Sequence, residues 1–214
     1  MKRVLVLASI IGIMPPLAAV ATSAPAAGPE QIKVGASCPG GNRWAVKTLT
    51  DASAGSVDYR RPVKATVASL AAQAPSTTIT ATTKRLPSEK TVYEVTAKLI
   101  KAKLSYEPDT KKGDEDITLV IADPTTGAMM IAELPKARCS PESRSIKAAQ
   151  MDKARSAFVA ACGTPPAGHF ETLHGIARIT GVGFFDLDHG KAQTGRAPHF
   201  RELHPLLAFS TTHC

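Results

Sequence analysis

The stretch GIARITGVGFFDLDHGKAQTGRAPHFRELHPLLAFS, residues 175–210, decides the fold. It predicts two β-strands, 176–186 and 202–210, because both segments are rich in apolar, β-branched and aromatic residues. The Gly, Pro and polar residues between them continue neither strand. A long loop crowded with Asp, His, Lys and Arg therefore joins the two strands, and any chemistry is expected in that loop.

Three further strands are predicted before this pair. Apolar and polar residues alternate over 93–104, and the apolar parity changes after Leu99, which predicts a bulge that bends one long strand. A polar loop, 105–116, leads to the apolar segment 117–122. A turn rich in Asp, Thr and Gly then leads to a strand at 129–134. These segments predict a three-stranded meander.

One long helix is expected between the third and fourth strands. Ser140 is suited to cap its N-terminus and Pro141 to occupy its first position, while Gly163 is a natural stop. Apolar residues recur at near-helical spacing between them, namely Ile146, Met151, Ala154, Phe158 and Cys162. The order β-β-β-α-β-β predicts a mainly β domain over 91–214, a five-stranded OB-like barrel in which one bent strand serves both sheets.

The N-terminal part of the chain predicts export and then an irregular extension. Residues 1–24 have the three parts of a secretory signal peptide: a basic start, an apolar run and small-residue cleavage sites. We therefore expect a secreted or periplasmic protein with no membrane span after cleavage. Residues 25–90 are rich in Ser, Thr and Pro and offer one short helix, 67–73, with Thr66 as its N-cap. Trp44 is expected to pack this extension onto the core.

Four cysteines in an exported chain indicate two disulfides rather than thiol chemistry or a zinc site. They are Cys38, Cys139, Cys162 and Cys214. The expected helix would hold Cys139 and Cys162 about 33 Å apart, far beyond the roughly 7 Å Cα limit for a bridge. The pairs Cys38–Cys139 and Cys162–Cys214 are favoured, and the crossed alternative stays open.

Several motifs of the chain resemble a bacterial family of exported proteins without established activity. They are GVGFFD at 181–186, HG at 189–190, QTG at 193–195, AP at 197–198 and ELHP at 202–205. Further matches are RWAVKT at 43–48, DITLV at 116–120 and MIAE at 130–133, so the resemblance covers most of the chain. The resemblance implies an OB-like barrel and no particular reaction. The chain departs from the family pattern by inserting Lys191-Ala192 and by placing His199-Phe200 beside Arg201.

The charged loops favour a binding module without catalysis. In such barrels the loops between strands one and two and between strands four and five flank the usual ligand face. The candidate ligand-binding residues are Asp186, His189, Lys191, Arg196, Arg201, Glu202 and His204. Exposed donors among them, together with a formal net charge of +8, favour an anionic or hydroxyl-rich envelope partner such as a protein or a glycan. Nucleic acid has weaker support, because aromatic residues make up only 5% of the chain.

No metal or other cofactor is expected. All six histidines lie in the last quarter of the chain near acidic residues, but their spacing repeats no zinc motif. We expect His204 and Glu202 to make hydrogen bonds that fix the loop to the last strand.

The alternative function is a metal-dependent nuclease or phosphodiesterase, because one class of such enzymes uses this barrel with carboxylates and arginines around the phosphate. Residues available for those roles are Asp114, Glu115, Asp116, Asp186, Glu202, Arg196 and Arg201. The residue spacing of that class is not reproduced, so this alternative rests on analogy of fold.

Overall fold

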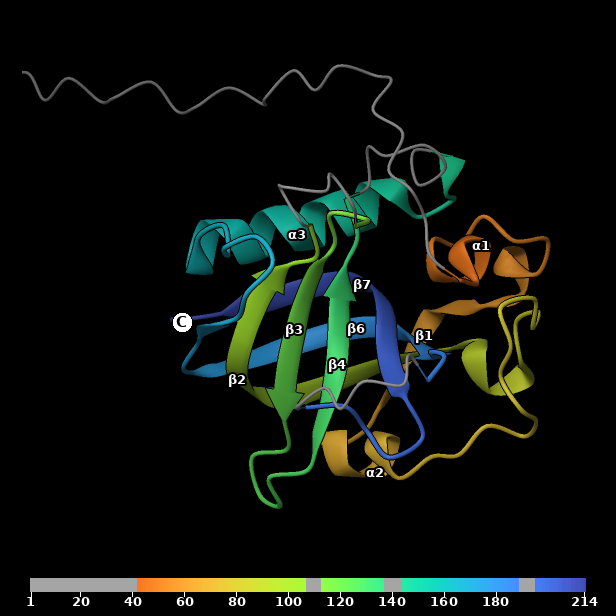
Figure 1. Ribbon diagram of the computed structural model, residues 1–214, viewed down its shortest axis with the longest axis horizontal. Coiled ribbons are helices and arrows are strands. Elements are labelled where there is room, and N and C mark those ends of the chain that lie inside the picture. The colour runs from red at the N-terminus through yellow and green to blue at the C-terminus, as the bar shows by residue number, and fades with distance from the viewer. Residues whose placement is uncertain (1–41, 107–112, 137–143, 189–194) are drawn as a thin grey trace, which may run out of the picture. The chain divides into compact units, whose positions relative to one another are not determined.

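The computed structural model describes residues 42–106, 113–136, 144–188 and 195–214. This part of the chain is mainly β, with a closed barrel, additional short strands and one main helix (Figure 1). None of its helices is long and apolar enough to cross a membrane. Several predictions concern residues outside the described ranges: the signal peptide, Cys38, Cys139, Ser140, Pro141, His189 and Lys191.

The barrel consists of five strands. They are β2 (Thr91–Leu104), β3 (Ile117–Ala122), β4 (Met129–Leu134), β6 (Ile176–Phe185) and β7 (Arg201–Thr211). Hydrogen-bonded neighbours follow the order β2-β3-β4-β7-β6, and β6 pairs again with β2, which closes the barrel. The pair β4–β7 is parallel and the other pairs of the ring are antiparallel. The predicted OB-like fold class is confirmed.

Strand β2 bends because it belongs to both sides of the barrel. Its first part, from Val92 to Lys98, pairs with β6, and its later part pairs with β3. The register shifts between Leu99 and Lys101, where the apolar parity changes in the sequence. A bulge adds local bend and twist, so one strand can turn the corner between two sheets. The predicted bulge is confirmed.

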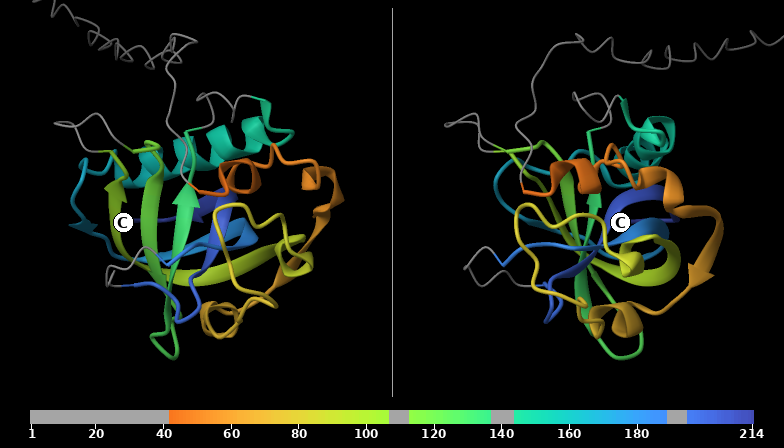
Figure 2. Two further views of the ribbon diagram at one scale, coloured as in Figure 1. Left: turned by 45° about the vertical axis from the view of Figure 1, so that its right-hand side comes forward. Right: turned by 90° about the vertical axis from the view of Figure 1, so that its right-hand side faces the viewer.

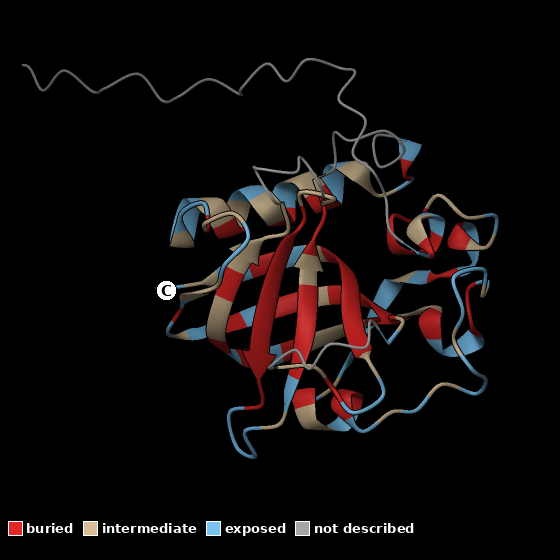
Figure 3. Ribbon diagram, in the orientation of Figure 1, coloured by how far each residue is buried: buried red, intermediate tan, exposed pale blue. Residues whose placement is uncertain are grey.

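Inside the barrel lies an apolar core that alternate strand residues supply. Ile117, Leu119 and Ile121 of β3 belong to it, as does Leu203 of β7. Successive side chains of a strand point to opposite faces, so Thr118 of β3 lies on the outer side of the sheet. All residues of β3 are nevertheless buried, as the red strand in Figure 3 shows. The outer face of this sheet is therefore covered as well.

Helix α3 (Ala148–Cys162) lies across one end of the barrel (Figures 1 and 2). Phe158 is fully buried, and its ring meets that of Phe209 of β7 edge-on at 5.3 Å between centroids. The disulfide Cys162–Cys214 joins the end of the helix to the C-terminus, as predicted.

The predicted start of this helix is wrong in the described part. Residues 144–147 are not α-helical, and Ile146 is 57% exposed rather than part of the buried face. The Ser145 hydroxyl accepts a hydrogen bond from the Lys147 amide at 3.2 Å. Such a local side-chain contact competes with helical hydrogen bonding and keeps the helix from starting earlier.

The segment before β2 is more regular than predicted. It holds α1 (Trp44–Lys47), β1 (Asp58–Lys64), α2 (Val67–Ala71) and two short 3₁₀ turns. β1 pairs in parallel with β2. The sequence does not predict this strand, because its residues are mostly exposed, show no apolar alternation and include Pro62. α2 is confirmed with Thr66 as its N-cap, and its apolar residues join the barrel core. A second missed strand, β5 (Glu171–Thr172), also pairs with β2.

Replacing Phe158 with Ala should lower the free energy of unfolding by about 3–5 kcal/mol, because it removes a fully buried ring from the helix–barrel contact. Chemical denaturation measures this loss. Ile146→Ala is the matched control, since its exposed side chain should change stability by less than about 0.5 kcal/mol. A loss below about 1 kcal/mol for Phe158→Ala would contradict the packing of α3.

Candidate functional site

Carboxylates from several elements gather around one lysine. Lys47 of α1 is buried, and its Nζ lies 3.3 Å from Asp186 Oδ1. The charges of Glu133, Glu202 and Asp114 also act on it. We call this group the acidic junction and define it as Asp114, Asp116, Glu133, Asp186 and Glu202, together with Lys47 and His204. Burial alone would lower the pKa of Lys47, but these carboxylates outweigh it and raise the pKa, so the lysine stays charged.

Strand alternation places these side chains outside the barrel interior. Leu203 of β7 faces the core, so its neighbours Glu202 and His204 face the opposite side. Glu133 of β4 is the register partner of Thr118 on β3, and the Thr118 hydroxyl donates to its Oε1 at 3.1 Å. These residues therefore share the outer face of β3, β4 and β7, which includes the strand pair that binds ligands in OB folds.

His204 lies between two carboxylates at the centre of the junction. Its Nδ1 is 3.2 Å from Glu133 Oε2, and its Nε2 is 3.5 Å from Asp116 Oδ2. The ring is fully buried and meets Phe184 edge-on. Both contacts are within ion-pairing distance, although neither is aligned as a hydrogen bond.

The local charges shift the pKa values of the junction in opposite directions. Burial disfavours the charged form of His204, but the contacts with Asp116 and Glu133 outweigh it and raise the pKa to about 10. Burial likewise opposes ionisation of Glu133, yet His204 and Lys47 lower its pKa to about 2. Burial and neighbouring carboxylates raise the pKa of Asp114 to about 7 and that of Glu202 well above its usual range. The network thus pairs a protonated His204 with an ionised Glu133.

The structure places the predicted binding residues at different depths. Asp186, Glu202 and His204 meet in the junction and are buried. His204 lies between Asp116, which directly precedes β3, and Glu133 of β4, and neither of its ring nitrogens makes an aligned hydrogen bond. The prediction that it hydrogen-bonds the loop to the last strand is therefore wrong. Arg196 is half-buried with its guanidinium over the Phe200 ring. His189 and Lys191 lie outside the described residues.

The prediction that Arg201 supplies an exposed donor is also wrong. Its side chain is fully buried, and its Nη2 donates to the Ser88 carbonyl at 3.1 Å. The guanidinium lies over the rings of Phe185 and Tyr93. Gly183 leaves the space that Arg201 occupies, because a Cβ at that position would overlap the guanidinium. Gly183 is therefore required by close packing against Arg201.

Sequence reasoning missed two members of the junction, Lys47 and Glu133, as site residues. Glu133 had a usable signal, because it is the one charged residue of the apolar strand β4 and faces away from the core. Lys47 had none, since its nearest partner, Asp186, is distant in the chain. Trp44, next to it in α1, is half-buried and lines a hollow of about 460 Å³ beside residues 51–53 and 81–85. It does not belong to the described barrel core, contrary to its predicted role.

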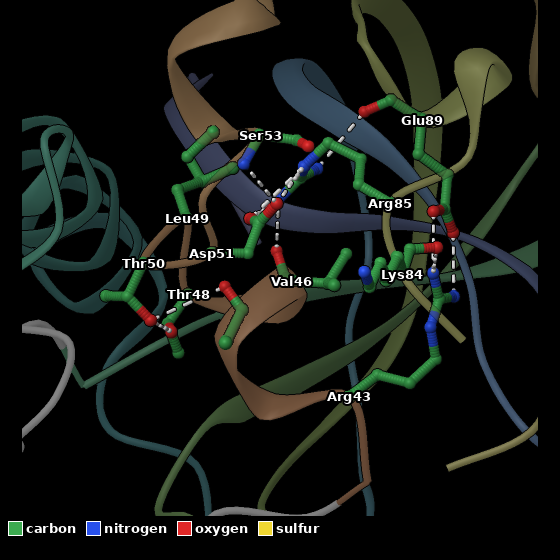
Figure 4. A network of polar contacts seen from close by, with 12 residues as sticks. Arg43, Val46, Thr48, Leu49, Thr50, Asp51, Ser53, Lys84, Arg85 and Glu89 are labelled. Carbon is green, nitrogen blue, oxygen red and sulfur yellow. Dashed lines mark hydrogen bonds and ion pairs between the residues drawn. The ribbon is translucent and has the colours of Figure 1, made fainter. Parts of the chain in front are cut away.

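A second polar network holds α1 in place, and Figure 4 shows it from close by. The Arg43 guanidinium donates to both Glu89 carboxylate oxygens, at 2.8 and 2.7 Å. It also donates to the carbonyls of Thr83, Lys84 and Phe185. All five N–H groups of Arg43 are therefore used, which is the full donor capacity of the side chain.

Glu89 is satisfied from both sides as well. Its Oε1 accepts from the Phe185 amide at 2.9 Å, and its Oε2 accepts from the Leu86 amide at 2.8 Å. Nearby, Arg85 pairs with Asp51 and donates to the Val46 carbonyl at 2.6 Å. These contacts join the segment containing α1 to the end of β6, one residue before Asp186.

Glu89→Gln should lower the free energy of unfolding by about 3–5 kcal/mol, because it leaves the Arg43 charge buried without its counter-ion. Urea denaturation followed by circular dichroism measures the change. Asp58→Asn is the control, since it breaks the exposed Arg61–Asp58 pair and should change stability by at most about 1 kcal/mol. Equal losses of unfolding free energy in the two variants would show that the buried pair contributes no more to stability than the exposed pair.

Comparison of the chain with models of known families, with curated proteins and with solved structures gives no match. The resemblance of its motifs to exported bacterial proteins therefore stays a prediction. Within the acidic junction, Asp116, Glu133 and His204 are the residues that could together hold a metal ion.

Proposed function

We propose that the protein is an exported OB-like binding module that does not turn its ligand over, with the rim of the acidic junction as its ligand site. The observation that carries this proposal is the meeting of two loops at Lys47. Asp114 belongs to the loop between β2 and β3, Asp186 to the loop between β6 and β7, and the charges of both act on this lysine. In OB barrels these are the loops that flank the ligand face.

The charge of the rim favours a cationic partner. Among the described residues of the junction, Asp116, Glu133 and Asp186 lie around the cationic groups of Lys47 and His204, and Asp114 adds a further negative charge above its pKa of about 7. Asp114 is partly exposed, so it can meet a partner directly, while Glu133 and His204 contribute to the electrostatic field of the rim. A surface with an excess of one sign of charge attracts the opposite charge. A cationic partner thus takes the place of the anionic partner expected from the sequence, because the proposed donor Arg201 is buried.

A non-catalytic role fits the burial of the candidate catalytic groups. Glu202 and His204 are 3% and 0% exposed, so neither can touch a ligand at the surface. In the phosphodiesterase alternative, arginines would face a phosphate, but Arg201 stacks on Phe185 and Arg196 lies over Phe200. One observation favours that alternative: Asp116, Glu133 and His204 could hold the metal ion that such chemistry needs.

At pH 8, above the Asp114 pKa of about 7, Asp114→Asn should weaken the binding of a fluorescently labelled oligolysine peptide by about two- to fivefold, as expected for one surface charge contact. Fluorescence anisotropy measures the affinity. Binding to the wild type should also weaken from 0.1 M to 1 M salt, because the Debye length falls from about 10 Å to about 3 Å. Asp58→Asn, an exposed acidic residue of β1, is the matched control and should bind like the wild type.

Two outcomes would contradict the proposal. Equal affinity of Asp114→Asn and the wild type would show that the rim is not the ligand site. A labelled oligonucleotide incubated with the same preparation tests the alternative. Cleavage that EDTA stops and that Glu202→Gln abolishes would establish the phosphodiesterase instead.

A further inference from the structure

Asp116, Glu133 and His204 present one ligand atom each to a common point. These three atoms lie within 4.8 Å of one another. Ligand atoms bound to one small divalent ion at roughly 2.0–2.2 Å lie about 3–4 Å apart, so small side-chain rotations suffice to close the set. The residues come from the start of β3, from β4 and from β7, which are hydrogen-bonded neighbours in the barrel. A rigid sheet thus supports all three.

Buried polar atoms without hydrogen bonds give a second, independent indication. Asp116 Oδ2 and both ring nitrogens of His204 have no aligned hydrogen bond, although these side chains are fully buried. Glu202 Oε2 is another such atom, on a residue that is only 3% exposed. The charge of Glu202 acts together with those of Glu133 and His204, so it belongs to the same cluster. Buried polar groups are almost always paired, and a bound ion would satisfy these.

We propose that Asp116, Glu133 and His204 bind one divalent transition-metal ion beneath the ligand rim. One ring nitrogen of His204 binds the ion, together with one oxygen each of Asp116 and Glu133. A dication bound here would offset the negative charges of its carboxylate ligands Asp116 and Glu133. This inference goes beyond the proposed binding function, which needs no metal.

The donor set selects the kind of ion. One imidazole nitrogen with carboxylate oxygens suits Zn²⁺ or Mn²⁺. Ca²⁺ instead takes six to eight oxygen ligands and rarely binds an imidazole nitrogen. Zn²⁺ is therefore the probe, Mn²⁺ the second choice and Ca²⁺ the contrast.

Isothermal titration of the EDTA-stripped, dialysed wild-type chain with Zn²⁺ tests the site. One Zn²⁺ should bind per chain and raise the melting temperature, while Ca²⁺ should not. His204→Gln should weaken Zn²⁺ binding more than about 100-fold, since even loss of an outer-shell partner costs 10- to 100-fold. Glu115→Gln is the matched control, because this neighbouring carboxylate pairs with Lys136 and lies outside the ligand set. It should bind Zn²⁺ like the wild type.

Further variants keep the test decisive if His204→Gln fails to fold. Asp116→Asn and Glu133→Gln each remove one ligand and should each weaken Zn²⁺ binding at least about tenfold. Failure of the wild type to bind Zn²⁺ or Mn²⁺, or equal affinity of all ligand variants and Glu115→Gln, would overturn the metal site. The Asp114→Asn variant separates the two proposals. If it binds oligolysine like the wild type while Zn²⁺ binding depends on His204, the rim is wrong and the metal site holds.

Discussion

The buried ion pair between Arg43 and Glu89 is the contact on which the proposed ligand rim depends. Both side chains are inaccessible to solvent, and every N–H of Arg43 has an acceptor. A buried pair is stabilising only when its desolvation is matched by good geometry and further hydrogen bonds, and this pair meets both conditions. Its links to the Phe185 amide and carbonyl join the N-terminal segment to the end of β6.

The link between the N-terminal segment and the end of β6 brings the charge of Lys47 into the junction. Lys47 follows Arg43 by one helical turn and reaches Asp186, the residue after Phe185. Without Lys47, the carboxylates of the junction would have His204 as the main nearby cation. The chain carries a net charge of +8, yet the outer face of β3, β4 and β7 gathers acidic groups. Local placement by strand alternation therefore decides the character of the site, and net charge does not.

The sequence was most informative where one face of a strand meets the core. Alternation located β2 with its bulge near Leu99, and apolar segments located β3, β4, β6 and β7. It was least informative for β1, whose residues are mostly exposed, and for the start of α3, where the Ser145 hydroxyl interrupts the helix. Within the site, Glu202 and His204 were predicted as ligand-binding residues, and both lie buried in the junction. Lys47 and the burial of Arg201 depend on contacts between distant segments, which no local pattern records.

Amide hydrogen exchange in Glu89→Gln tests most directly whether the Arg43–Glu89 pair fixes the segment around Phe185 more tightly than it fixes the barrel core. The account predicts that the Phe185 and Leu86 amides, which donate to the Glu89 carboxylate, exchange much faster in the variant. Amides of Leu119 and Ile121 in β3 should exchange only through global unfolding, so their rates should rise less than that of Phe185. Unchanged protection of Phe185, or an equal increase at Phe185 and across β3, would contradict it.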